Sequence, residues 1–351
     1  WQKVRFDYWQ TLHDLWKENY FRPLFEWCDR NNIQFTGHFM EHEWPYPWIS
    51  PDDASLAAFM HMPGIDMLVG AELRTKGVDP HMLFTIRQVA SVSHQLGRRA
   101  FSETYGVAGW DSTLEHYKRM GDWQLVNGIN FINQHLAFTT IRGARKRDHP
   151  QSFSDISAWW PYYRLHADHT ARLSYVLSQG VPRNRVLVLA PTTSGFLWAR
   201  RGTDTPELAR LRESYDQLNQ FLADHQIDFD LGDEYMLEWF GEARDGKLTI
   251  AKATYDLVVW PQGMINVRKQ TLPVLAQYLE SGGEVLALDE PAAFIDGRAS
   301  DAVKNLRTQN SVRWHTVHDP AGLVTEIHHR LPPRVTFDKE LPPGIGHRMW
   351  T

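Results

Sequence analysis

The sequence predicts an α/β protein in two parts: the C-terminal half of a (β/α)8 barrel over residues 1–182 and a second α/β domain over residues 183–330. Four helix-then-strand units of about 30 residues follow one another in the first part, which is typical of a parallel sheet. Each strand is followed directly by polar and ionisable residues, as in barrels and open α/β sheets. A break at Gly180-Val181-Pro182 precedes a second alternation of strands and helices.

The four units of the first part can be placed along the chain. The first has a helix over 7–31, with a break or restart expected at Pro23, and a buried strand over 33–38. The other helices and strands are expected at 52–62 and 64–69, at 80–96 and 98–102, and at 113–127 and 129–133. Because the chain begins at Trp1 within what we expect to be a longer protein, we interpret the units as strands five to eight of the barrel.

The second part resembles a flavodoxin-like or glutamine-amidotransferase-like module. Its strands are expected at 185–191, 227–230, 257–260 and 284–288, and its helices at 206–225 and 269–281. It has neither a nucleophilic cysteine nor a Gly-rich phosphate loop, so we expect a structural role. The acidic stretch Asp233-Glu234-Tyr235 is expected on the surface, the alternative being the barrel mouth. We expect a further β module over 331–351, beginning with a strand at Val335-Thr336-Phe337.

Composition excludes several classes of protein. The chain has 37 basic and 42 acidic residues, a net charge of −5, no basic block, and no apolar run that could span a bilayer. Nucleic-acid and membrane-surface binding are therefore not expected. The single cysteine, Cys28, excludes an internal disulfide and is expected in the core. Most of the 15 tryptophans precede residue 161, which favours ligand binding in the first part.

The stretch 99–112 contains the main catalytic candidate, Glu103. A short apolar run leads into Ser102-Glu103, and Tyr105, two glycines and Trp110 follow. Catalytic residues of barrel enzymes lie at such strand ends. A carboxylate beside aromatic rings suits a sugar, whose ring faces need an apolar platform and whose bond cleavage needs an acid or base. The alternative is a glutamate that caps a helix or forms an ion pair.

Other strand ends carry similar residues, namely Glu41, Glu43, Glu72, His38, His42 and His135. Glycoside cleavage needs two carboxyl groups, and the sequence does not say which pair acts. His38 and His42 have the spacing of a zinc-binding helix, but His38 ends a predicted strand, so this geometry is not expected. Calcium would suit carboxylates and amides, although no Asp-rich loop is present. Sugar stacking and loop packing are equally open for Trp44, Trp48 and Trp110.

Several segments together resemble glycoside hydrolase family 106, the α-L-rhamnosidases. These segments are Thr36-Gly37-His38 with Glu41-His42, 62–68, 102–106, Gly109-Trp110, 145–148 and 159–162. The resemblance covers most of residues 1–200 and extends more loosely to about 290. It implies a (β/α)8 barrel, an adjacent α/β domain, further β-sandwich modules, and inverting hydrolysis assisted by calcium.

The resemblance also suggests residue roles. Glu103 matches the general base, and Glu41 is the second catalytic candidate, although the general acid is expected on a strand before Trp1. Substrate-binding candidates are His38, Glu72, Tyr105, Trp110, His135 and Trp44, and no metal ligand is assigned. The expected substrate is an oligo- or polysaccharide, and the expected location is periplasmic or secreted. The alternatives are a retaining β-galactosidase-like enzyme with Glu103 as nucleophile and a non-catalytic carbohydrate-binding barrel.

Overall fold

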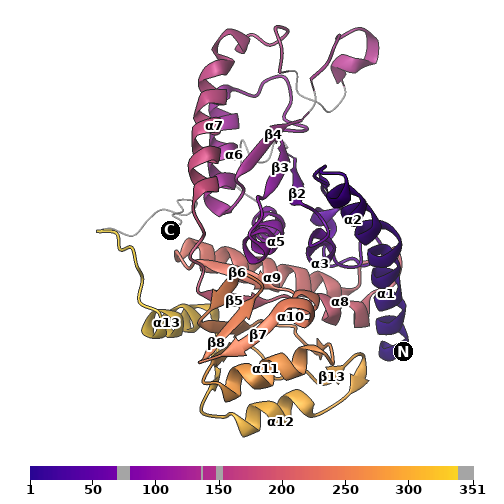
Figure 1. Ribbon diagram of the computed structural model, residues 1–351, viewed down its shortest axis with the longest axis vertical. Coiled ribbons are helices and arrows are strands. Elements are labelled where there is room, and N and C mark those ends of the chain that lie inside the picture. Colours follow the sequence, from indigo (N-terminus) through magenta and orange to yellow (C-terminus); the bar gives the residue numbers. More distant parts are fainter. Residues whose placement is uncertain (69–79, 136, 148–152, 339–351) are drawn as a thin grey trace.

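The computed structural model describes residues 1–68, 80–135, 137–147 and 153–338, and it contains two parallel sheets (Figure 1). The first sheet has the strand order β1-β2-β3-β4 and pairs only in parallel. Its strands are β1 (Thr36–Gly37), β2 (Met62–Met67), β3 (Phe101–Thr104) and β4 (Phe131–Gln134). The four strands expected in the first part are thus present, in chain order.

The N-terminal helix is continuous but changes its winding before Pro23. It consists of α1 (Gln2–Trp16), the π-helical turn η1 (Lys17–Phe21) and α2 (Arg22–Arg30). Proline has no N–H and clashes with the carbonyl four residues earlier in a regular helix. The π turn widens the helix at this point, and Pro23 follows directly as the second residue of α2, so the change of winding accommodates the proline ring. Cys28 is buried on α2, as expected.

Helices α3, α5, α6 and α7 accompany the first sheet; their bounds are Asp53–Ala57, Pro80–Leu96, Leu114–Asn127 and Tyr163–Gln179. Helix α6 begins with a capping box in which the side chains of Thr113 and His116 each accept the backbone N–H of the other residue. It ends at Gly128, whose φ of 119° suits glycine. These local signals explain why the boundaries of α6 agree with the sequence expectation.

The second sheet has the strand order β15-β12-β10-β5-β6, again with parallel pairing throughout. Its strands are β5 (Val186–Leu189), β6 (Phe229–Gly232), β10 (Leu257–Trp260), β12 (Glu284–Ala287) and β15 (Trp314–Thr316). Numbered within this sheet and read from β6, the order is 2-1-3-4-5, that of doubly wound flavodoxin-like sheets. Alternate residues enter two separate cores: Leu187 and Val258 pack on one face, Val188 and Val259 on the other.

The helices of this region are α8 (Thr192–Trp198), α9 (Pro206–Asp224), α10 (Glu234–Phe240), α11 (Thr271–Glu280), α12 (Ala302–Gln309) and α13 (Pro320–Arg330). Two small sheets add β7 (Gly241–Arg244), β8 (Lys247–Ile250) and β9 (Ala253–Tyr255), and β11 (Asn266–Val267), β13 (Phe294–Ile295) and β14 (Arg298–Ala299). The hairpin between β7 and β8 turns at Asp245-Gly246, which have φ values of 53° and 72°. This is a strong hairpin signal.

Helix α5 joins the two sheets and lies between them (Figure 1). Its polar side chains satisfy the backbone of β6, the edge strand of the second sheet. Arg87 donates to the carbonyl of Phe229, Gln95 donates to that of Leu231, and Ser91 accepts the N–H of Leu231. An unpaired edge would expose its hydrogen-bonding groups. These contacts explain why α5 buries so many polar residues.

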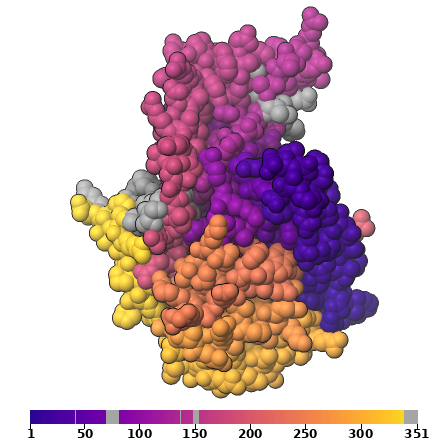
Figure 2. Space-filling view, viewed as in Figure 1, coloured from indigo at the N-terminus to yellow at the C-terminus, as the bar shows by residue number. Residues whose placement is uncertain are grey.

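Helix α1 also connects the two sheets. In the space-filling view, the N-terminal segment (indigo) lies along one side of the molecule, against both parts (Figure 2). Nε2 of His13 on α1 is hydrogen-bonded to the hydroxyl of Ser55 on α3 at 2.8 Å. The same ring stacks on Tyr235 of α10, with 3.9 Å between the ring centroids. The N-terminal helix therefore packs on elements of both sheets.

The predicted strand at Val335-Thr336-Phe337 is wrong, because residues 331–338 form no regular element. The described helices include none with the length and hydropathy needed to cross a bilayer.

Candidate active site

Glu103 lies in the middle strand pair of the first sheet, near the carboxyl ends of the strands. The register places it beside Asp66 of β2 and Asn133 of β4. Because side chains alternate along a strand, its neighbours Ser102 and Thr104 face the other way. Both are fully buried and hydrogen-bonded to Gln124 of α6, at 2.5 and 2.7 Å. Gln124 thereby holds β3 so that Glu103 faces away from α6.

Two imidazoles flank the carboxylate of Glu103. Oε2 lies 3.6 Å from Nε2 of His38, which follows β1, and Oε1 lies 3.6 Å from Nε2 of His135, which follows β4. The three side chains are 25, 30 and 18% exposed, respectively. A separation of 3.6 Å exceeds a hydrogen bond. Both carboxylate oxygens therefore retain lone pairs for a water molecule or a sugar hydroxyl, and the structure brings together three predicted site residues.

A side-chain hydrogen bond orients the ring of His38, whereas a backbone hydrogen bond and packing place His135. Nδ1 of His38 donates to the carbonyl of Phe39 at 2.8 Å, which leaves Nε2 toward Glu103 as an acceptor or, in the protonated ring, as a second donor. The backbone N–H of His135 donates to the carbonyl of Thr104 at 2.8 Å and ties the end of β4 to β3. Gly106 lies against the ring of His135, since a Cβ at this glycine would be 3.0 Å from Cδ2.

Tyr105 does not contact substrate in this arrangement, which corrects the prediction for this residue. Its φ of 74° turns the chain directly after β3, and its side chain is fully buried. The ring packs against Tyr117 and Phe153, the hydroxyl lies 3.3 Å from Nε2 of His166, and burial raises the pKa of the phenol. A buried ring presents no face to a sugar, so Tyr105 contributes to the site only by packing in the core beneath the end of β3.

Trp44 is likewise a core residue and not a sugar platform. It is 6% exposed and packs on Phe84 of α5 and Tyr215 of α9. Its indole N–H donates to the hydroxyl of Thr192 at 3.1 Å. Of the two uses left open by the sequence, loop packing is the one observed, and it anchors the segment after β1 to the second sheet.

Trp110 remains available as a platform. Its side chain is 45% exposed, its ring lies parallel to that of Phe138 with 6.2 Å between centroids, and its indole N–H donates to the carbonyl of Lys146 at 2.7 Å. Lys146 belongs to the exposed 3-10 helix η3 (Gly143–Arg147) in the basic loop. An indole fixed at its nitrogen and open on its face can stack on a sugar ring.

Glu41 opens the 3-10 helix η2 (Glu41–Glu43) just beyond β1, so its backbone lies at the same edge of the sheet. Nε2 of His42 donates to the carbonyl of Asp66 at 2.5 Å, and Nε2 of His81 donates to the carbonyl of His42 at 2.7 Å. The catalytic role of Glu41 stays a prediction. Glu72 lies outside the described residues.

His81 anchors η2 through a buried pair with Asp216. Its Nδ1 lies 2.9 Å from Oδ2 of Asp216 on α9, and both residues are 6% exposed. We expect His81→Leu to lower the free energy of unfolding by about 3 kcal/mol, because it leaves the carboxylate and the His42 carbonyl without this donor. Urea unfolding measures the change.

The double variant His81→Leu/Asp216→Leu provides the control. Removing both partners is less costly than stranding one of them, so we expect the double variant to regain part of the lost stability. Equal stabilities of His81→Leu and the wild type would show that the pair does not stabilise this junction.

The described residues include no group of three or more His, Cys, Asp or Glu side chains arranged to hold a metal ion. Nδ1 of His38 donates to the carbonyl of Phe39, whereas Nε2 of His42 donates to that of Asp66. The calcium requirement implied by the family resemblance stays a prediction. Sequence reasoning missed Asp66, although a carboxylate within an otherwise apolar strand is a signal for a residue placed on a functional face.

The acidic stretch after β6 is buried, so its predicted surface position is wrong. Asp233, Glu234 and Tyr235 are 3, 1 and 1% exposed. Asp233 caps α10 through the N–H groups of Tyr235 and Met236, and Glu234 accepts hydrogen bonds from Thr193, Thr271 and the backbone of Arg268. Backbone and hydroxyl donors in the interior satisfy these acids, and composition alone does not reveal such donors.

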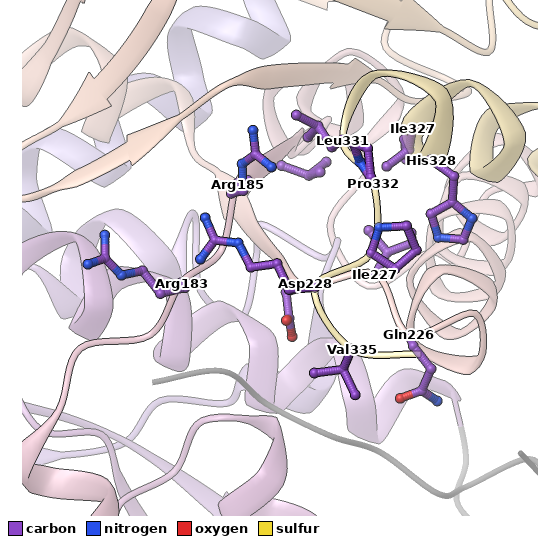
Figure 3. A pocket seen from close by; sticks show the side chains of 13 residues that line it. Arg183, Arg185, Gln226, Ile227, Asp228, Ile327, His328, Leu331, Pro332 and Val335 are labelled. Carbon is purple, nitrogen blue, oxygen red and sulfur yellow. The ribbon is translucent and has the colours of Figure 1, made fainter. Parts of the chain in front are cut away.

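A small cavity lies in the second sheet, at the amino ends of β5 and β6. Arg183, Arg185 and Asp228 line one side, and the end of α13 with His328 lines the other (Figure 3). Its volume of about 70 Å³ has room for a few water molecules but not for a sugar ring. This cavity is therefore separate in position and in size from the edge that carries Glu103.

Comparisons with known proteins show which folds this chain is similar to. No family model matches the chain. A Formosa agariphila protein named "Putative beta-glucuronidase" is 23% identical over 305 residues, which are 82% of this chain and 24% of that protein. A rhamnosidase from Novosphingobium sp. PP1Y aligns with a TM-score of 0.65 and 18% identity, over 92% of this chain and 28% of its own.

A GH42 exo-carrageenase from Bacteroides ovatus aligns with a TM-score of 0.64 and 14% identity, over 97% of this chain and 47% of its own. The chain therefore spans about a quarter of the length of the first two proteins and about half of the third. These likenesses support a mixed α/β fold with parallel sheets, similar to glycoside hydrolases built on a barrel.

Proposed function

We propose that this chain is the part of a glycoside hydrolase that carries the catalytic carboxylate Glu103, and that the enzyme removes terminal α-L-rhamnosyl residues from an oligo- or polysaccharide. The observation that carries the proposal is the carboxylate of Glu103, held between His38 and His135 at the carboxyl edge of a parallel sheet. The similarity to a rhamnosidase supports the choice of sugar. We also interpret the first sheet as strands five to eight of a barrel, and expect a periplasmic or secreted location.

In the proposed reaction, Glu103 accepts a proton from a water molecule as the water attacks the anomeric carbon. The bond to the leaving oxygen breaks, and a second carboxyl group gives that oxygen a proton. Glu41 is the candidate for this group within the chain. His38 and His135 flank the Glu103 carboxylate and leave its oxygens open to the water molecule, and Trp110 offers its indole face to a sugar ring.

The retaining alternative is supported by Asp66. It lies in register with Glu103 on the neighbouring strand, so both side chains leave the same face of the sheet from backbones about 4.8 Å apart, and the distance between the carboxyl groups depends on their rotamers. A retaining enzyme places its two carboxyl groups about 5–5.5 Å apart, whereas an inverting enzyme needs about 6.5–9.5 Å for the water molecule. In this alternative Glu103 is the nucleophile and forms a glycosyl ester before water enters.

Hydrolysis of aryl α-L-rhamnoside by the full-length protein, followed by NMR, tests both versions. Release of the aryl alcohol with an inverted sugar as first product supports the proposal, and a retained anomer supports the alternative. Aryl β-galactoside and β-glucuronide serve as competing substrates, and a chelator tests the calcium requirement that the family resemblance implies. Saccharide binding without hydrolysis of any of the three substrates would overturn the enzyme proposal.

A further inference from the structure

A second cavity, of about 410 Å³, lies at the carboxyl end of the second sheet. Its lining comes from the end of α8, from one side of α9 and from the loops after β10 and β12. The lining residues are Trp198, Glu207, Arg210, Leu211, Glu213, Ser214, Gln217, Gln262, Gly263 and Asp289. We call it the switch-point crevice. The strand order reverses between β5 and β10, since β6 lies on one side of β5 and the later strands β10, β12 and β15 lie on the other. Ligands of open α/β sheets bind at this position.

The floor of the switch-point crevice is fixed by Asp289. Its Oδ2 accepts the N–H of Gly263 at 3.0 Å, and its Oδ1 accepts the N–H of Glu290 at 2.8 Å. Gly263 has a φ of 78°, and a Cβ there would lie 2.6 Å from Cδ1 of Leu211. These contacts hold the loops after β10 and β12 in place and leave further lone pairs on both oxygens of Asp289.

One wall of the crevice is aromatic. Trp198 is partly exposed and packs, like Tyr46 and Trp48, on an apolar cluster that includes Phe196 and Leu208. It also packs on the core cluster that includes Val188 and Leu218, so the indole is supported by two apolar clusters where it borders the cavity. A partly exposed ring backed by a core is a rigid platform for the C–H face of a ligand.

The remaining lining groups are mainly hydrogen-bond acceptors and amides. Glu207, Glu213 and Asp289 contribute three carboxylates, whereas Arg210 contributes one guanidinium, which lies 3.9 Å from Glu207. Gln217 and Gln262 each add one carboxamide, and Ser214 adds a hydroxyl. The formal charge of the lining is −2, which repels phosphate and carboxylate ligands. The Gly-rich loop that would hold a nucleotide phosphate is also absent from this sequence.

We propose that the switch-point crevice binds an uncharged saccharide. The face of a sugar ring lies on Trp198, its hydroxyls donate to Asp289 and the neighbouring carboxylates, and the amide of Gln262 donates to a hydroxyl or ring oxygen. Nucleotides, sugar phosphates and uronates are excluded by charge. This site is separate from the edge that carries Glu103, so it retains saccharide whether or not the chain hydrolyses it.

Calorimetric titration of the full-length protein carrying Glu103→Gln, with L-rhamnose and D-galactose as probes, tests the proposal. The same titrations are repeated after adding Trp198→Ala or Gln262→Ala, and inorganic phosphate serves as the charged probe. Gln262 is exposed, so its loss does not threaten folding. Trp27→Ala is the matched control, because it removes a tryptophan that is 52% exposed on α2.

We expect saturable binding of at least one sugar, weakened about tenfold by Trp198→Ala and severalfold by Gln262→Ala, with no effect of Trp27→Ala. In the protein with Glu103 intact, the two crevice variants should leave kcat for hydrolysis unchanged. Sugar titrations that neither crevice variant changes relative to Glu103→Gln alone would overturn the proposal, as would saturable binding of phosphate that these variants abolish. If the protein with Glu103 intact hydrolyses none of the tested glycosides, but sugar binding is weakened by Trp198→Ala, the proposed hydrolysis is refuted and this inference stands.

Discussion

Replacing Glu103 with glutamine is expected to lower kcat for glycoside hydrolysis by about 10²- to 10⁴-fold. Glutamine has nearly the same shape but accepts no proton from water at neutral pH. It still reaches the space between His38 and His135, where the carboxylate oxygens lie 3.6 Å from each Nε2. Steady-state kinetics on an aryl glycoside measures the loss, and calorimetry on a natural oligosaccharide should show that binding remains.

Glu115→Gln is the matched control for this substitution. Glu115 is exposed in the first turn of α6, on an element that also supports β3, so its loss changes the charge by the same amount at a site without contact to Glu103. Its kinetics should equal those of the wild type. Turnover by Glu103→Gln at the wild-type rate would remove Glu103 from the mechanism in both its inverting and retaining forms.

Glu234 is expected to make folding stability depend on pH. Its side chain is buried between α8, β11 and the start of α11, and this burial raises its pKa from 4.5 to about 7. Hydrogen bonds from Thr193, Thr271 and the backbone N–H of Arg268 lower the pKa again but do not cancel the effect of burial. The folded protein therefore binds a proton at Glu234 at pH values where the unfolded chain has lost it.

The sign of the effect follows from this difference in bound protons. Stability from Glu234 is fully present below pH 4.5 and is lost as the pH rises to about 7. The shift corresponds to about 3 kcal/mol of unfolding free energy. Glu234→Gln has no carboxyl group to titrate at this position. The difference in unfolding free energy between the wild type and the variant should therefore change by about 3 kcal/mol between pH 4.5 and about 7. Urea unfolding at several pH values measures it.

Two features make this comparison specific. The burial of Asp52 raises its pKa and the burial of His13 lowers its pKa, so both also change stability with pH, but they are present in both proteins and cancel in the difference. The exposed Glu242 on β7 provides the control Glu242→Gln, which should follow the wild-type curve. Parallel pH profiles for wild type and Glu234→Gln would show that Glu234 titrates alike in the folded and unfolded chains.

Most of the sheet framework could be predicted because it depends on local pattern. Parallel strands buried on both faces appear as short apolar runs, and this signal located β5, β6, β10 and β12 to within a few residues. The short strands β7, β8 and β9 escaped prediction, although the Asp245-Gly246 turn is a hairpin signal. Their pairing partners, not their own composition, make them strands.

The sequence by itself indicated that ionisable residues follow the strands at one edge of a parallel sheet, because strand direction and side-chain alternation are local properties. Only the tertiary structure decided which of these residues meet. It brings His38 and His135 to Glu103 and buries Tyr105 and Trp44. The physical reason is that burial and contact depend on segments distant in the chain. α6 and α7 cover Tyr105, and α5 and α9 enclose Trp44; none of these contacts is encoded by the residues adjacent to either ring.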